Sequence, residues 1–259
     1  MRMRRVVAQA VSEVIACGRW ACEAPPGLRV LLYHAIGSPA LGDAYGLFSI
    51  SRDQFIGQMN YLAASYRDRV ISLSPDTACG ATAQLAITFD DGYDDNLTVA
   101  APILVERGLP FTVFVTSDFV KQGRPGFLSL SGLRELAAMP NVTIGAHGAT
   151  HVALPVCDDA GLRDELCRSK RDLEDAIGRS VGTMAYPYGA TDRRVRAAVQ
   201  DAGYRLAASS YATVNDEKRD PFVLGRTEVL GGESLRVFRQ RLHGDWDWYR
   251  WRTKDPATV

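Results

Sequence analysis

The chain has 259 residues, 46% of them hydrophobic and 23% charged, so it can bury a sizeable core in one large α/β domain or in two small ones. Its 30 basic and 30 acidic residues cancel, which argues against a surface for nucleic acid or another polyanion. The cysteines (Cys17, Cys22, Cys79, Cys157 and Cys167) include no CxxC pair, which argues against a disulfide framework and a thiolate zinc site.

The first 27 residues, MRMRRVVAQAVSEVIACGRWACEAPPG, place basic residues ahead of an apolar stretch, as a secretory signal does. Gln9, Ser12 and Glu13 interrupt that stretch, which is also too short to span a membrane. We therefore prefer a short surface helix that ends before the Pro25-Pro26-Gly27 break, in a protein of the cytoplasm. Export, or weak association with a membrane surface, is left open as the alternative.

Strand-like and helix-like runs alternate after this extension, which indicates a parallel α/β fold. The expected strands are 29–34, 85–89, 111–116, 142–146, 182–186, 204–209 and a run near 222–229. The expected helices are 51–65, 101–108, 161–178, 192–203 and 234–244. We predict one catalytic domain at 28–250, preceded by the extension at 1–27 and followed by a tail at 251–259.

Several of the expected helices carry their own start and stop signals. Ser51 can cap the first of them, and Pro102 suits the first turn of the second. Gly108 and Gly178 are placed to end the second and third helices, because glycine tolerates the left-handed conformation that follows a helix. These signals predict where the connecting loops begin.

Polar residues follow the ends of the expected strands. They are His34, the pair Asp90 and Asp91, the pair His147 and His151, and the segment Tyr186-Pro187-Tyr188-Gly189. The carboxyl ends of parallel strands form the binding face in barrels and in open sheets. We therefore expect these groups to converge.

The segment GAHGATH presents two imidazoles four residues apart, a spacing at which both can bind one metal ion. An aspartate from another strand can add an oxygen ligand. Each feature alone has a plainer explanation, since HxxxH can be two surface histidines and DDG can be a turn with a left-handed glycine. Together, in this order and at strand ends, they indicate a site with two histidines, one aspartate and open positions.

Three motifs, TFDDG at 88–92, HGATH at 147–151 and AYPYG at 185–189, resemble those of the polysaccharide deacetylases with the NodB-homology domain. The resemblance extends from about His34 to Asp245. It implies a distorted (β/α) barrel. The segments LLYHAI and FSISRDQFIGQMNYL are most similar to the branch that acts on exopolysaccharides such as poly-N-acetylglucosamine.

The resemblance also separates the two acids. It implies that Asp91, His147 and His151 bind a divalent metal, with zinc as first choice and cobalt or nickel as alternatives. Asp90 would act as general base toward the attacking water, and the backbone N–H of Tyr188 would hold the oxyanion. The implied reaction removes N-acetyl groups from an amino-sugar glycan and releases acetate and a free amine. A plain proline turn is the other interpretation of YPYG.

The sequence departs from the family pattern in two places. Ala185 stands where an arginine usually pairs with the base, and Arg226 in LGRTEV is our candidate to replace it, against an ordinary ion-pair or surface role. The usual late histidine that acts as general acid is hard to find. We prefer His34, at a strand end, to His243, which follows a helical run. A structural hydrogen bond beneath the site is the alternative for His34.

Two other functions stay open. A deacylase or deformylase acting on a small amide or a lipid-linked amino sugar would use the same residues, and only loop GSPALGDAYGLF and its neighbours could separate it from a polymer enzyme. A non-catalytic carbohydrate-binding relative is the other, although such a module needs no base beside a metal. The expected partner is a glycan or amino sugar, with no nucleic acid and no stable membrane insertion, and the oligomeric state is left undetermined.

Overall fold

The structure is a computed structural model that describes residues 2–18, 25–80, 82–252 and 254–258. The prediction for residues 1–27 therefore lies partly outside the described residues, as do the side chains of Cys17 and Cys22. Cys79, Cys157 and Cys167 are free. No helix in the described ranges has the length and apolar character needed to cross a membrane.

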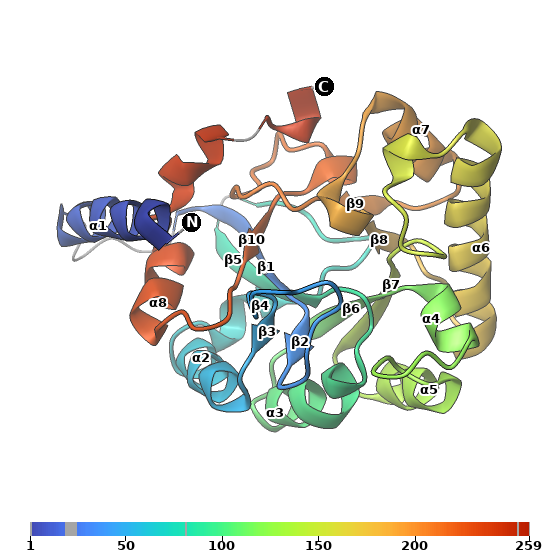
Figure 1. Ribbon diagram of the computed structural model, residues 1–259, viewed down its shortest axis with the longest axis horizontal. Coiled ribbons are helices and arrows are strands. Elements are labelled where there is room, and N and C mark those ends of the chain that lie inside the picture. The colour runs from blue at the N-terminus through green and yellow to red at the C-terminus, as the bar shows by residue number, and fades with distance from the viewer. Residues whose placement is uncertain (1, 19–24, 81, 253, 259) are drawn as a thin grey trace.

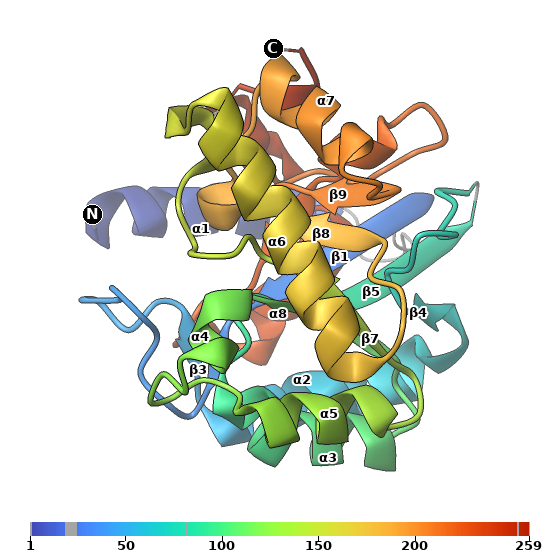
Figure 2. The same cartoon turned by 90° about the vertical axis from the view of Figure 1, so that its right-hand side faces the viewer.

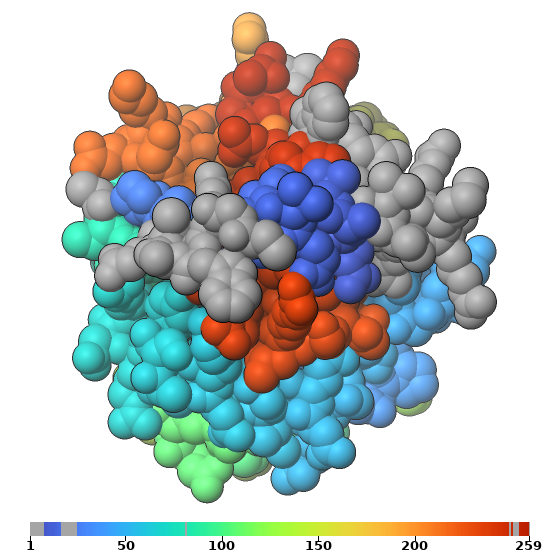
Figure 3. All heavy atoms as spheres, turned by 90° about the vertical axis from the view of Figure 1, so that its left-hand side faces the viewer, coloured from blue at the N-terminus to red at the C-terminus, as the bar shows by residue number. Residues whose placement is uncertain are grey.

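Helix α1 (Arg2–Gly18) lies against the C-terminal part of the chain, as Figure 3 shows. Ser12 is fully buried and accepts a hydrogen bond of 3.1 Å from the indole Nε1 of Trp248. Glu13 pairs with Arg236 at the surface. The helix at the start of the chain is thus packed on the residues that follow the last strand.

The strands form one parallel sheet in the order β10-β1-β5-β6-β7-β8-β9, with the short β4 also paired to β5. Their bounds are β1 (Gly27–Tyr33), β4 (Val70–Ile71), β5 (Ala83–Phe89), β6 (Phe111–Val115), β7 (Val142–Ala146), β8 (Thr183–Ala185), β9 (Leu206–Ala208) and β10 (Arg226–Glu228). A parallel bridge between Ala208 and Leu224 joins the end of β9 to the approach to β10. The sheet therefore nearly closes (Figure 1), and the distorted (β/α) barrel expected from the sequence is confirmed.

Helices surround this sheet. Their bounds are α2 (Arg52–Ser65), α3 (Ala101–Glu106), α4 (Ser117–Lys121), α5 (Leu130–Ala138), α6 (Asp159–Ile177), α7 (Arg193–Asp201) and α8 (Leu235–His243). Figure 2 shows α6 crossing in front of the sheet, with α2, α3 and α5 along the lower side of that view. A separate pair of short strands, β2 (Ala35–Ile36) and β3 (Ser49–Ile50), encloses the loop between them.

The helix signals in the sequence are confirmed. The Ser51 hydroxyl accepts from the backbone N–H of Gln54, and Gly178 ends α6 with φ of 67°. Helix α5 was not predicted, although Ser129 caps it and Leu133, Leu136 and Ala137 recur at helical spacing on its buried face. The second predicted helix also begins earlier than residue 101, since a π-helical turn, Asn96–Ala100, leads into α3.

The core has two parts because side chains alternate along each strand. Val30, Ala86 and Phe114 belong to a smaller cluster inside the barrel. Leu31 and Ile87, which lie between those positions, belong to the larger cluster that packs the strands against the helices. Residues in the inner set continue to the carboxyl ends of the strands, where they become polar.

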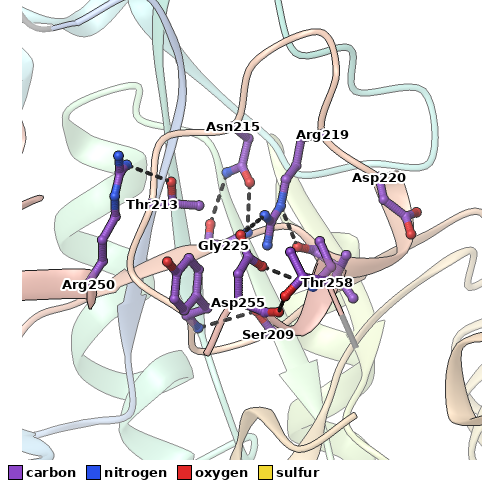
Figure 4. A network of polar contacts seen from close by, with 12 residues as sticks. Ser209, Thr213, Asn215, Arg219, Asp220, Gly225, Arg250, Asp255 and Thr258 are labelled. Atoms are coloured by element: carbon purple, nitrogen blue, oxygen red, sulfur yellow. Dashed lines mark hydrogen bonds and ion pairs between the residues drawn. The ribbon is translucent and has the colours of Figure 1, made fainter. Parts of the chain in front are cut away.

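A polar network fixes the segment that precedes β10 (Figure 4). The amide Nδ2 of the buried Asn215 donates to the backbone oxygens of Leu28 and Gly225 at 3.0 and 2.9 Å. Its Oδ1 accepts from the Gly225 N–H at 2.7 Å. Arg219 in the same network pairs with Asp255 at 2.6 Å. The network thus joins β1 to the residues directly before Arg226.

We predict that Asn215→Ala lowers the free energy of unfolding by roughly 2–4 kcal/mol, because it removes buried hydrogen bonds and leaves the backbone groups of Gly225 without their partner. Urea denaturation measures the loss. Glu217→Ala, at an exposed neighbouring position, is the control and should change stability by less than about 0.5 kcal/mol. Equal stabilities for the two variants would contradict this role for Asn215.

Candidate active site

The carboxyl ends of the strands open into one pocket with a volume of about 250 Å³. It brings together the residues that the sequence singled out, namely His34, Asp90, Asp91, His147, His151, Tyr188 and Arg226. Leu41, Phe48, Tyr93 and Glu228, which the sequence did not single out, also line it. The convergence expected from strand ends is therefore present.

Asp90 and Arg226 form a buried ion pair with two hydrogen bonds. Nη1 and Nη2 of Arg226 donate to the two carboxylate oxygens of Asp90 at 2.6 and 2.7 Å. Nε of Arg226 donates to the Ser209 carbonyl at 2.8 Å, so the guanidinium group is fixed on both sides. Arg226 is thus the cation that pairs with Asp90, as we expected from the sequence, in which position 185 is an alanine.

The environment of Asp90 favours its ionised form. Burial alone would raise the pKa of this carboxyl, but attraction by Arg226 and His147 outweighs burial and lowers it. Strand register directs the Arg226 side chain toward the inside of the barrel, because Val30 of β1 lies between Arg226 of β10 and Ala86 of β5. Asp90 continues the inward-facing set of β5 that contains Ala86.

Asp91 faces the two histidines instead. Its Oδ1 lies 3.4 Å from Nε2 of His147 and 3.1 Å from Nε2 of His151. One ligand atom from each of these residues lies within 4.8 Å of the others, so the group could hold one metal ion. Burial opposes the charge of Asp91, but its contacts with the two imidazoles hold its pKa well below its usual range.

The donor atoms of this group suit a divalent cation. Nδ1 of His147 lies 2.8 Å from the carbonyl oxygen of Ala185, which can only accept, so Nδ1 carries the hydrogen. In the neutral ring Nε2 then presents a lone pair toward the Asp91 carboxylate. Two acceptors this close repel unless a cation or a proton lies between them. Imidazole nitrogen with carboxylate oxygen is a ligand set typical of zinc and related metals.

Backbone strain is concentrated at the pocket. Asp91, His151 and Tyr188 have φ of 73°, 65° and 60°, a left-handed conformation that costs a non-glycine residue about 1–3 kcal/mol. Gly92, with φ of 79°, completes the DDG turn. DDG is therefore a turn with a left-handed glycine, and its two acids face different partners, Arg226 for Asp90 and the two histidines for Asp91.

Glu165, which the sequence analysis missed, supports the loop between the two histidines. Its Oε2 accepts from the backbone N–H groups of Ala149 and Thr150 at 2.8 and 3.0 Å, and its Oε1 accepts from the Thr150 hydroxyl at 2.6 Å. One signal could have revealed it. Glu165 is three residues after Leu162 and one before Leu166, so it lies on the apolar face of α6, where a carboxylate needs partners.

The two candidate general acids are separated by the fold. His34 lines the pocket, and its Nδ1 is buried with no hydrogen-bond partner among the described residues. His243 instead lies 3.0 Å from the Tyr66 hydroxyl and does not line the pocket. Glu228 lines it as well, and burial raises the pKa of this carboxyl against the attraction of His34.

Tyr188 stands at the rim of the pocket. Its side chain is 69% exposed, and its ring centroid lies 4.7 Å from that of His151. The role expected for its backbone N–H in holding an oxyanion stays a prediction, as do the catalytic roles expected for Asp90, His34 and Arg226.

A parallel barrel that carries, at the carboxyl ends of its strands, a paired carboxylate beside a group that can hold a metal is an α/β barrel with a candidate metal-assisted active site. Residues 78–207 match the sequence model of the family described as polysaccharide deacetylase. The chain belongs to the polysaccharide deacetylase family, whose members are metal-dependent carbohydrate de-N-acetylases. The resemblance and the enzyme class expected from the sequence are confirmed.

Individual relatives agree with this assignment. YxkH of Bacillus subtilis (strain 168), named as a polysaccharide deacetylase, is 24% identical over 222 residues, which cover 83% of this chain and 76% of that protein. The structure of the Streptococcus pyogenes deacetylase PplD, in complex with acetate, is similar with a TM-score of 0.74 and 21% identity, covering 84% of this chain and 99% of that one. The structure of IcaB from Ammonifex degensii is similar with a TM-score of 0.65 and 22% sequence identity, covering 86% of this chain and 98% of that one. At these identities the solved structures show the common fold.

We predict that Arg226→Met lowers the free energy of unfolding by roughly 3–5 kcal/mol, because it leaves the Asp90 carboxylate buried without its cation. Thermal or urea unfolding measures the loss. The double variant Arg226→Met/Asp90→Asn, which removes that charge, should recover part of the stability. A loss in the double variant equal to the sum of the losses in Arg226→Met and Asp90→Asn would show that the pair is not coupled.

Proposed function

We propose that the protein is a divalent-metal-dependent hydrolase that removes N-acetyl groups from an amino-sugar glycan of the poly-N-acetylglucosamine type. The observation that carries the proposal is the difference between two adjacent acids in one pocket. Asp91 faces His147 and His151, whereas Asp90 is paired with Arg226. A binding module has no use for a separately oriented carboxylate beside a metal group, and family membership supports hydrolysis.

In this proposal Asp91, His147 and His151 hold the metal, with zinc as first choice and cobalt or nickel as alternatives. When bound, a cation held by these residues would supply Lewis-acid chemistry to the amide carbonyl and to the attacking water. Asp90 takes the proton from the attacking water, and Arg226 keeps its carboxylate ionised and oriented.

The remaining steps fall to residues on other strands. The backbone N–H of Tyr188 donates a hydrogen bond to the oxygen on which negative charge develops. The C–N bond then breaks, and His34 gives a proton to the departing nitrogen. The products are acetate and a sugar with a free amine.

Mass spectrometry of N-acetylglucosamine oligomers of different lengths and linkages, incubated with zinc-, cobalt- or nickel-loaded protein, tests this function. We expect acetate and deacetylated oligomers. Turnover of small or lipid-linked amides alone would favour the narrower deacylase. Binding of oligomers without turnover under any metal would favour a carbohydrate-binding relative.

Substitutions of Asp90 and Asp91 should have different effects on metal content and turnover. Asp90→Asn should keep metal and lose about 10²–10⁴-fold in turnover, the contribution usual for general acid–base catalysis. Asp91→Asn should instead lose metal, because one of the ligands is weakened. Metal analysis by mass spectrometry, alongside the turnover assay, separates the outcomes. Equal metal loss in the two variants would contradict the division of roles.

His34→Ala should leave metal content unchanged and lower kcat, because the departing nitrogen would lose its proton donor. His243→Ala, outside the pocket, is the control and should change little. Substrates whose leaving group needs no protonation should be cleaved by His34→Ala nearly as well as by the unmutated enzyme. A loss on those substrates as large as on the natural amide would exclude His34 as the acid.

A further inference from the structure

One side of the pocket is formed by residues 35–48, here called the wall segment. Ala40, Leu41 and Phe48 of this segment line the pocket, and the Phe48 ring lies 5.1 Å from the ring of His34. Its two ends are joined, because β2 pairs with β3 and the Ala35 N–H donates to the Phe48 carbonyl at 3.2 Å. The segment is therefore a closed loop with apolar residues toward the pocket.

A single buried carboxylate holds the start of this loop. Oδ2 of Asp95 accepts from the backbone N–H groups of Ile36 and Ser38, at 2.7 and 3.2 Å, and from the Ser38 hydroxyl at 2.6 Å. Asp95 is only 7% exposed. A buried carboxylate that accepts several donors stabilises one loop conformation strongly, because every alternative leaves its charge without partners.

Residues on either side of Asp95 also hold the wall segment. The Tyr93 hydroxyl accepts from the Leu41 N–H at 2.6 Å. Nδ2 of Asn96 donates to the His34 carbonyl at 2.9 Å and to Oδ1 of Asp95 at 3.1 Å. Tyr93 and Asn96 are buried as well. Contacts from 93–96 therefore run along the chain from His34 to Leu41.

The segment 93–96 directly follows the turn that contains Asp90 and Asp91. The same short stretch of chain thus carries the proposed base, one proposed metal ligand and the contacts that hold the wall segment. A shift of the wall relative to Asp90 would require breaking the bonds to Asp95. This carboxylate therefore contributes to the distance between the apolar wall and the reacting groups, together with the contacts of Tyr93 and Asn96.

We infer that Asp95 is a positioning residue that fixes the wall segment so that an N-acetylated sugar binds with its amide facing Asp90. This inference rests on the proposed function. Leu41 and Phe48 present an apolar surface of the kind that contacts the C–H face of a sugar ring, in the same pocket as Asp90 and Asp91. Asp95 touches neither substrate nor metal group in this account and acts through the wall.

Asp95→Asn tests the inference, because the amide fills the same space but loses the charge and presents N–H groups to donors. We expect KM for N-acetylglucosamine oligomers to rise about tenfold, equivalent to about 1.4 kcal/mol, with unchanged metal content and a smaller effect on kcat. Hydrogen exchange at the Ile36 and Ser38 amides should become at least about tenfold faster. Exchange in β5 should not change.

Matched variants distinguish positioning from a general loss of structure. Asp94→Asn removes the neighbouring, exposed acid and should leave KM and exchange unchanged. Ser38→Ala removes one of the three donors to Oδ2 of Asp95. It should change KM and amide exchange in the same direction as Asp95→Asn but by a smaller factor, and it should have no added effect in the Asp95→Asn background. If Asp95→Asn does not fold, Ser38→Ala carries the test alone through the same two readouts, because it keeps the carboxylate and removes only one donor.

The outcomes separate the inference from the function on which it rests. An unmutated protein that deacetylates no oligomer with any metal would overturn the proposed function, and this inference with it. An active enzyme whose KM and amide exchange are the same in Asp95→Asn would overturn only the positioning role. Loss of metal in Asp95→Asn would also overturn it, because the carboxylate would then act on the metal group and not on the wall.

Discussion

The buried pair of Asp90 and Arg226 is the interaction on which the arrangement of the pocket depends. An ionised carboxylate inside a barrel is strongly unfavourable alone, and an unpaired guanidinium group is equally so. Their two parallel hydrogen bonds satisfy both charges, but only if β10 and β5 keep their places on either side of β1. The network around Asn215 positions the residues before β10, and so helps to keep Arg226 in place beside Asp90.

Once Asp90 is paired in this way, the adjacent Asp91 is free for a different task. The left-handed conformation at Asp91 turns its carboxylate away from Arg226 and toward His147 and His151. Two neighbouring acids thus acquire different surroundings, one cationic and one of imidazole nitrogens. Different environments of this kind allow two chemically identical groups to have different chemical properties within one pocket.

Further buried carboxylates support the site by accepting from backbone N–H groups. Glu165 holds the loop between the histidines, and Asp95 holds the wall opposite the proposed base. Both belong to elements that were already in place for packing, α6 and the turn that leads into α3. Such contacts limit the movement of loops that would otherwise sample many conformations, which keeps the reacting groups at fixed separations.

The sequence by itself determined the alternation of strands and helices, the caps at Ser51 and Gly178, and the set of polar residues at strand ends. Each of these is local, because a strand end, a cap or an HxxxH spacing is written in consecutive residues. The short helix α5 was not predicted, although its cap at Ser129 and its apolar spacing are local signals of the same kind. Only the tertiary structure decided which groups meet. Arg226 reaches Asp90 across 136 positions of sequence, and this contact depends on strand register. Glu165 and Asp95 accept from the backbone of loops, whose course depends on left-handed turns. Parallel neighbours are joined by long crossovers, so their register depends on contacts between residues far apart in the chain.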